Sequence, residues 1–163
     1  MNDLDDFTTP QATILIVDDE KNTREGLRRS FEDDFDVYIA ADIAGAMDIL
    51  KNANVELMVT DLRLGGENGM DLIDSALQLP NAPISIMMTA YGSVDTAVDA
   101  MKRGAYEYVT KPLNIDELEL LIKRALRSKS IVEENKSLKK QVEKRFSVSN
   151  IIGTSPAMQP VFD

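Results

Sequence analysis

The sequence predicts an α/β fold in which a parallel β-sheet is covered by helices on both faces. Short, apolar, β-branched segments alternate with segments whose apolar residues recur at helical spacing. This alternation occurs five times, and each helical connection is long enough to join two parallel strands. The 163 residues, 44% hydrophobic and 28% charged, suffice for one packed domain with an appendage.

The expected strands are short runs bounded by polar or turn-forming residues, beginning with "TILIV". Near-continuous apolar character is typical of strands that are buried on both faces of a sheet. The five runs cover residues 13–17, 37–40, 55–61, 84–90 and 106–110.

Helices are expected between these strands, the first over residues 23–31. Asp42 suits the N-cap of the second helix, and Ser93 suits the N-cap of the fourth. The third helix is expected to begin near Met70, and Gly104 is expected to end the fourth.

The composition excludes several classes of protein. The formal net charge of −10, with 28 acidic and 18 basic residues, argues against nucleic-acid binding through a broad basic face. Without cysteine there is no disulfide scaffold or thiolate zinc site, and a cytoplasmic location is compatible. No apolar run approaches the roughly 20 residues of a membrane span. The acidic residues 1–11 are expected to form a disordered lead.

Chemically useful side chains follow the expected strands. Asp18 and Asp19 follow the first strand, and Asp61 ends the third. Thr89 lies at the end of the fourth strand and Lys111 after the fifth. In parallel sheets of this class, ligands bind beyond the carboxyl ends of the strands, so these residues should converge. The carboxylates and the hydroxyl offer only oxygen ligands, and such a ligand set suits Mg²⁺.

Each of these residues also has an ordinary structural interpretation. A single Asp at a strand end is more often a turn residue or helix cap than a ligand. Lys111 could be a solvated loop residue, and the Thr89 hydroxyl could bond the backbone. Glu20 is expected to face solvent or cap the following helix. The glycine-rich "LGGENG" at residues 64–69 lacks the GxxxxGK[ST] pattern, so no ATPase site is expected here.

Taken together, the motifs resemble the receiver domain of bacterial two-component response regulators. They are "VDDE" at residues 17–20, "VTDLRLGGENGMDL" at 59–72, "MTAYG" at 88–92 and "YVTKPL" at 108–113. The resemblance covers about residues 12–127. It implies a flavodoxin-like (βα)5 domain, doubly wound, with a parallel sheet of strand order 2-1-3-4-5.

The resemblance assigns the metal site and the phosphoacceptor. Asp61 is implied to accept a phosphoryl group from a sensor histidine kinase, since the chain contains no histidine of its own. Mg²⁺ is implied to bind Asp19, Asp61 and the backbone carbonyl of Arg63 directly, and Asp18 mainly through water. The only activity expected is Mg²⁺-dependent self-phosphorylation and dephosphorylation.

The resemblance also assigns the residues that respond to phosphorylation. Lys111 is implied to pair with the phosphoryl group, and its bond to Pro112 is usually cis in relatives. Thr89 is the expected switch hydroxyl, and Tyr108 is the expected switch aromatic.

A long helix is expected from near Asp116 to about Phe146. Four apolar residues of its first part should pack on the sheet: Leu118, Leu121, Ile122 and Ala125. Over residues 128–146 a short heptad pattern predicts a parallel coiled-coil dimer. A solvated linker is the alternative, because the pattern extends over only two heptads. The expected seam residues are Ile131, Asn135, Leu138 and Val142.

Residues 147–163 resemble the opening of the AAA+ ATPase module of sigma-54-dependent activators, especially "IIGTSPAM" at residues 151–158. The resemblance implies a transcription regulator with downstream ATPase and DNA-binding domains beyond this sequence, and the heptad pattern predicts that it is a homodimer. Two other classes stay open: a small Mg²⁺-dependent phosphatase with a similar acid cluster, and a stand-alone receiver that binds a motor or kinase.

Overall fold

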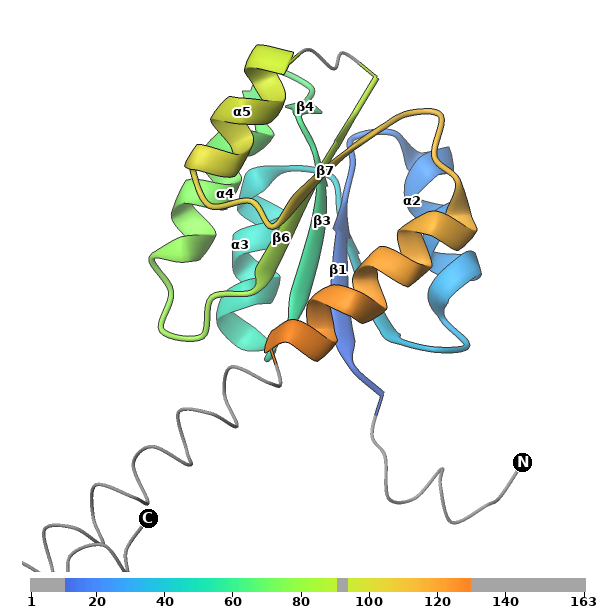
Figure 1. Ribbon diagram of the computed structural model, residues 1–163. Helices are drawn as coiled ribbons and strands as arrows, with labels where there is room; N and C mark the ends of the chain where they lie inside the picture. The colour runs from blue at the N-terminus through green and yellow to red at the C-terminus, as the bar shows by residue number, and fades with distance from the viewer. Residues whose placement is uncertain (1–10, 91–93, 130–163) are drawn as a thin grey trace, which may run out of the picture. The chain divides into compact units, whose positions relative to one another are not determined.

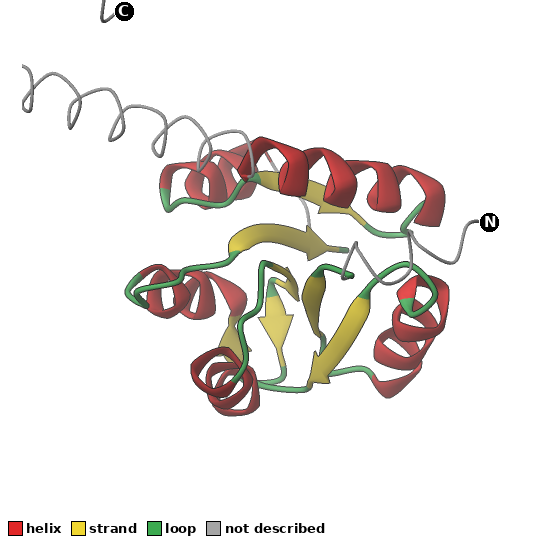
Figure 2. Cartoon of the chain, turned by 90° about the horizontal axis from the view of Figure 1, so that it is seen from below, coloured by secondary structure: helices red, strands yellow, loops and turns green. Residues whose placement is uncertain are grey.

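The computed structural model describes residues 11–90 and 94–129, which fold into three layers (Figures 1 and 2). The central layer is a five-stranded sheet. Helices α3 (Ile43–Asn52), α4 (Gly69–Leu77) and α5 (Val94–Lys102) lie on one face. Helix α2 (Lys21–Phe31) and the helical residues 115–126 cover the other face.

The main sheet has the order β2-β1-β3-β6-β7, and every neighbouring pair in it is parallel. This confirms the flavodoxin-like fold. It also confirms the expected order 2-1-3-4-5, in which the fourth and fifth strands of the sheet are β6 and β7. Boundaries differ slightly; the third main strand, for example, begins two residues later than expected. The strands are β1 (Thr13–Val17), β2 (Asp36–Ala40), β3 (Leu57–Asp61), β6 (Ile84–Thr89) and β7 (Glu107–Thr110).

Alternate residues of the central strands enter two separate cores. In β1, Ile14 and Ile16 pack beneath α2 and residues 115–126, whereas Leu15 and Val17 pack beneath α3 and α4. All four side chains are fully buried. A strand covered on both sides needs apolar residues at every position, which explains the uninterrupted apolar runs.

The helix ends follow the expected capping chemistry at two of three sites. The Asp42 side chain accepts a hydrogen bond of 2.8 Å from the backbone N–H of Gly45 and caps α3. After α5, Gly104 has a left-handed φ of 108°, as the expected terminator requires. Ser93, the third expected cap, lies outside the described residues.

Two features differ from expectation on the face that carries α4 and α5. A small hairpin, β4 (Arg63–Leu64) and β5 (Glu67–Asn68), replaces the expected loop, turning through Gly65 at a φ of 65°. Strands of two residues are too short to show periodicity in a sequence. In α5, the helix itself is confirmed, but Val94 and Val98, two of the apolar residues that predict it, are exposed.

The C-terminal helix is described over residues 115–129. Its expected sheet-facing residues Leu118, Ile122 and Ala125 are buried, and Leu121 packs partly buried against the same core. The chain divides into two compact units after Leu126, and only residues 127–129 of the second are described.

The coiled-coil seam and the ATPase-like segment lie outside the described residues, so the domain limits 12–127, 128–146 and 147–163 stay predictions. Among the described residues, no helix combines the length and apolar character needed to cross a membrane.

Candidate functional site

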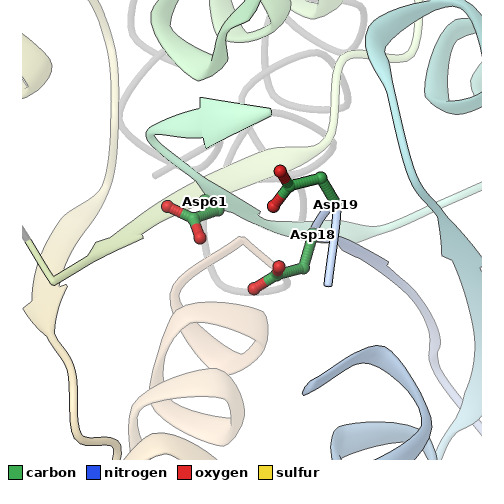
Figure 3. A group of neighbouring side chains, drawn as sticks. All are labelled: Asp18, Asp19 and Asp61. Atoms are coloured by element: carbon green, nitrogen blue, oxygen red, sulfur yellow. The ribbon is translucent and has the colours of Figure 1, made fainter. Parts of the chain in front are cut away.

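Three carboxylates meet at the carboxyl end of the sheet, the upper end in Figure 1. Asp18 and Asp19 follow β1, and Asp61 is the last residue of β3, the adjacent strand. One oxygen from each side chain lies within 4.8 Å of the others, and Figure 3 shows the three side chains gathered there. Asp18 is fully buried and Asp61 is 7% exposed, while Asp19 is open to solvent.

Lys111 supplies the compensating positive charge. Its Nζ lies 2.9 Å from Asp18 Oδ2 and 2.8 Å from Asp61 Oδ2. The lysine is held in place because its backbone N–H donates to the carbonyl of Thr89 at 2.9 Å. The peptide bond from Lys111 to Pro112 is cis, as the resemblance implies. The predicted convergence of strand-end residues is therefore present in the structure.

Burial and hydrogen bonding act against each other at this cluster. Burial raises the pKa of the Asp18 carboxyl, although hydrogen bonds from Lys111 and from the backbone N–H of Glu20 oppose the rise. For Lys111, burial acts to lower the pKa, but the hydrogen bonds to Asp18 and Asp61 raise it overall. Lys111 is accordingly a firmly protonated cation between two carboxylates.

The hairpin after Asp61 contacts the acids through backbone donors. The N–H of Gly65 donates to Asp19 Oδ2 at 2.9 Å, and the N–H of Arg63 donates to Asp61 Oδ1 at 3.2 Å. Asp19 is thereby oriented by a residue 46 positions away. Glu20 lies at the N-cap position of α2, yet its side chain makes no capping hydrogen bond and is exposed, so it faces solvent.

The expected switch residues lie on the neighbouring strands. Thr89 is fully buried at the end of β6, one residue beyond Met88, the strand partner of Asp61. Tyr108 in β7 is the strand partner of Met87 in β6. Its side chain is partly buried and packs against the core beneath α3 and α4. The sheet therefore places Thr89 nearer the acids and Tyr108 two residues further back along the adjacent strand pair.

Two residues near the site were missed by the sequence reasoning. The half-buried Arg24 donates from Nη1 to the backbone carbonyl of Asp18 at 2.8 Å, and nothing in the sequence signals this contact. At Gly69 an added Cβ would lie only 2.1 Å from the carbonyl oxygen of Asp61. Of the glycines in residues 64–69, Gly65 makes the turn of the hairpin, whereas Gly69 permits a close approach of two backbone segments.

The donor set fits a hard divalent cation. The clustered ligand atoms are all carboxylate oxygens, and one oxygen each of Asp18 and Asp61 is already bonded to Lys111. Close carboxylates need cationic compensation beyond one lysine, and Mg²⁺ prefers oxygen ligands with several retained waters. The residues present thus suit Mg²⁺, the ion that the resemblance implies for this site.

Comparisons with known proteins agree with this site. A family model described as the response regulator receiver domain matches residues 14–123. The regulatory protein AtoC of Escherichia coli is 32% identical over 149 residues, covering 91% of this chain and 32% of that protein. The response regulator protein PilR of Pseudomonas aeruginosa is 35% identical over 147 residues, covering 89% of this chain and 31% of that protein. The chain spans about a third of the length of these relatives.

Solved structures give the same result. The structure of NtrX from Brucella abortus in complex with ADP matches with a TM-score of 0.72 and 30% identity, over 80% of this chain and 29% of that one. The beryllofluoride-activated NtrC4 receiver domain dimer matches with a TM-score of 0.67 and 31% identity, over 71% of this chain and 97% of that one. These similarities confirm the expected resemblance to the receiver domains of sigma-54-dependent activators. The chain belongs to the receiver domain family of two-component response regulators.

Proposed function

We propose that Asp61 accepts a phosphoryl group from a phosphohistidine of a sensor kinase, and that this modification controls a larger transcription regulator. The observation that carries the proposal is the position of Lys111 Nζ, within 2.9 Å of both Asp18 and Asp61 at the end of the sheet. A cation placed there faces both the nucleophile and the charge that an incoming phosphoryl group brings.

The transfer forms one bond and breaks one. An oxygen of Asp61 attacks phosphorus, the P–N bond to the kinase histidine breaks, and the released imidazole retains the electron pair and takes up a proton. Asp61 is oriented for this step by hydrogen bonds that it accepts from Lys111 Nζ and from the N–H of Arg63. Catalysis then consists mainly of positioning and charge stabilisation.

The metal would be held at the same edge. Asp19, Asp61 and the backbone carbonyl of Arg63 are the proposed direct ligands of Mg²⁺, with Asp18 acting through water. When bound, the ion neutralises charge on the phosphoryl oxygens. The contribution of this chain is to keep the acids oriented, which Gly65 does for Asp19 through its backbone N–H at 2.9 Å.

The signal would leave the site through the neighbouring strands. Phosphorylation adds about −1.5 to −2 charges, and the Thr89 hydroxyl would turn to donate to a phosphoryl oxygen. Tyr108 would then turn into the space that Thr89 leaves and repack the surface near α5 and β7. Such a change need only bias two packings that differ by a few kcal/mol.

The output would be exerted by a homodimeric regulator. The proposed seam at Ile131, Asn135, Leu138 and Val142 would keep two chains together, and phosphorylation would rearrange receiver contacts within that dimer. The downstream ATPase and DNA-binding domains would act on sigma-54-dependent transcription. The NtrX structure contains ADP and extends well beyond its match to this chain. It therefore supports the proposal that this receiver domain belongs to a larger regulator that binds a nucleotide elsewhere.

Intact-mass spectrometry after treatment with acetyl phosphate and Mg²⁺ tests the proposal. The wild-type chain should gain roughly 80 Da for one phosphoryl group, and Asp61→Asn should gain nothing. A full gain in Asp61→Asn would place the acceptor elsewhere. Sustained release of inorganic phosphate from a simple phosphate ester, without a retained group, would indicate a phosphatase instead.

A further inference from the structure

Helix α5 packs unevenly against the rest of the domain. Among its residues Ala100, near the C-terminal end, is the buried one. In the N-terminal half the apolar side chains of Val94 and Val98 are 80% and 45% exposed, respectively, and at the C-terminal end Met101 is 43% exposed beside the buried Ala100 and Ala105. Since apolar burial supplies most of the packing energy of a helix, the N-terminal half of α5 is weakly attached.

The C-terminal end of α5 is, by contrast, closely fixed. The N–H of Ala105 donates to the carbonyl of Ala100 at 3.0 Å, and that of Gly104 donates to Met101 at 3.2 Å, which is the Schellman pattern. An added Cβ at Gly104 would lie 2.5 Å from Leu77 Cδ1, so the last turn of α4 packs directly on this helix end.

Arg103 joins the same end of α5 to α4 by charge. Its guanidinium engages both carboxylate oxygens of Asp74, with Nε at 3.3 Å from Oδ1 and Nη2 bonded to Oδ2. Nη2 also lies 3.4 Å from Asp71 Oδ1, one turn earlier on α4. On α5 itself, Nη1 lies 3.6 Å from Asp99 Oδ2. The hydrogen bonds that the Arg103 guanidinium donates to Asp74 are the main cause that raises the pKa of Arg103.

The other end of α4 is fixed beside Asp61. The N–H of Gly69, the first residue of α4, donates to the carbonyl of Leu62 at 2.6 Å, and Gly69 touches the Asp61 carbonyl. Helix α4 is therefore attached at its start to the residues that follow β3 and at its end to Arg103 and Gly104. Two attachments on one helix restrain the C-terminal end of α5 relative to the sheet.

We propose that Arg103, Asp71 and Asp74 form a clamp that makes the C-terminal end of α5 the fixed pivot of the phosphorylation response. Movement on phosphorylation is then concentrated in residues 94–98, and residues 99–105 stay in place. This inference rests on the proposed function, because it concerns how α5 responds to modification of Asp61.

The size of the effect follows from the exposure of the clamp. The Arg103 side chain is 31% exposed and that of Asp74 is 46% exposed, so solvent screens each pair. The two-pronged contact with Asp74 adds geometric restraint beyond a single pair. Loss of the clamp should speed amide exchange in residues 99–105 roughly two- to fivefold.

The test is segment-resolved hydrogen exchange on the 163-residue chain with and without acetyl phosphate and Mg²⁺. In the wild type, phosphorylation should change exchange in residues 94–98 and leave residues 99–105 unaltered. In Arg103→Gln the change should extend through residues 99–105. Lys102→Gln is the matched control, because it removes the same charge from an exposed position on the same helix and should behave as the wild type.

Two further variants separate the clamp from general charge effects. Arg103→Lys keeps the charge but loses the two-pronged contact, so it should fall between the wild type and Arg103→Gln. The double variant of Arg103→Gln with Asp74→Asn should be no more mobile than Arg103→Gln alone, because both changes remove one interaction. Additive effects of the two changes would overturn the clamp.

Intact mass recorded on the same samples distinguishes the two levels of failure. If the wild type is not phosphorylated, the proposed function fails first. If Asp61 is phosphorylated and exchange changes equally along all of α5 in the wild type, the pivot is wrong although the phosphoacceptor is right. Equal behaviour of Arg103→Gln and Lys102→Gln would likewise overturn it.

Discussion

Replacing Gly69 by alanine should distort the domain at the proposed phosphoacceptor. Gly69 is the first residue of α4, and a Cβ there would lie 2.1 Å from the carbonyl oxygen of Asp61. The nearest neighbours are backbone atoms, so no side-chain rotation relieves the contact. A comfortable nonbonded separation is about 3.5 Å, so the two chain segments must part by more than 1 Å.

The expected magnitude combines a cost and a gain. Inserting a methyl group where backbone must move costs about 1–3 kcal/mol, comparable to overpacking of a core. Alanine recovers at most about 1 kcal/mol of helix propensity at this first helical position. The hydrogen bond from Gly69 to Leu62, now 2.6 Å, also lengthens. The net loss in the free energy of unfolding should be about 1–2 kcal/mol.

Urea unfolding followed by circular dichroism measures this loss, and Gly66→Ala is the matched control. Gly66 lies in the same glycine-rich stretch, and an added Cβ there meets no atom within 4 Å. The control should keep its midpoint, whereas Gly69→Ala should unfold at lower urea. Phosphorylation of Gly69→Ala should also slow, because the displaced carbonyl belongs to Asp61. Equal midpoints for the two variants would refute the close approach.

Three further predictions concern the acids, the lysine and the distal helix. Asp19→Ala removes a proposed direct ligand, so isothermal titration should show weaker Mg²⁺ binding; unchanged affinity would mean that the ion is held elsewhere. Lys111→Gln leaves a buried carboxylate without its cation, so urea unfolding at neutral pH should show a loss of about 1–3 kcal/mol; an unchanged midpoint would argue against the pairing. The double variant of Ile131→Glu with Leu138→Glu should sediment as a monomer yet gain a phosphoryl group normally. A persistent dimer would assign the interface to the receiver alone.

The order of elements was predictable because both sheet faces are covered. Strands such as β1 must then be apolar at every position, which leaves an unambiguous run in the sequence. The acidic site was predictable for a related reason. Charged residues directly after an apolar run mark the end of a buried strand, and parallel strands bring such ends together at one edge of the sheet.

Other features could not be predicted because they depend on contacts between distant segments. Helical periodicity shows that Val94 and Val98 share a face, but it does not show whether another element covers that face, and it lies exposed. Arg24 and Gly69 contact backbone carbonyls, which leave no pattern in the side chains of the chain. The hairpin of β4 and β5 is too short to carry a period.

The hairpin and α4 together give residues 61–77 a structural role that the strand-end acids alone do not show. At the start of this segment, Gly65 binds the Asp19 carboxylate through its N–H, and Glu67 accepts a hydrogen bond of 3.2 Å from the first N–H of α3. At its end, Asp74 binds Arg103 beyond α5. A change at Asp61 therefore acts on a segment already attached to Asp19, to α3 and to the C-terminal end of α5. Because these attachments are hydrogen bonds and ion pairs at defined positions, they restrain residues 61–77 relative to Asp19, to α3 and to the C-terminal end of α5.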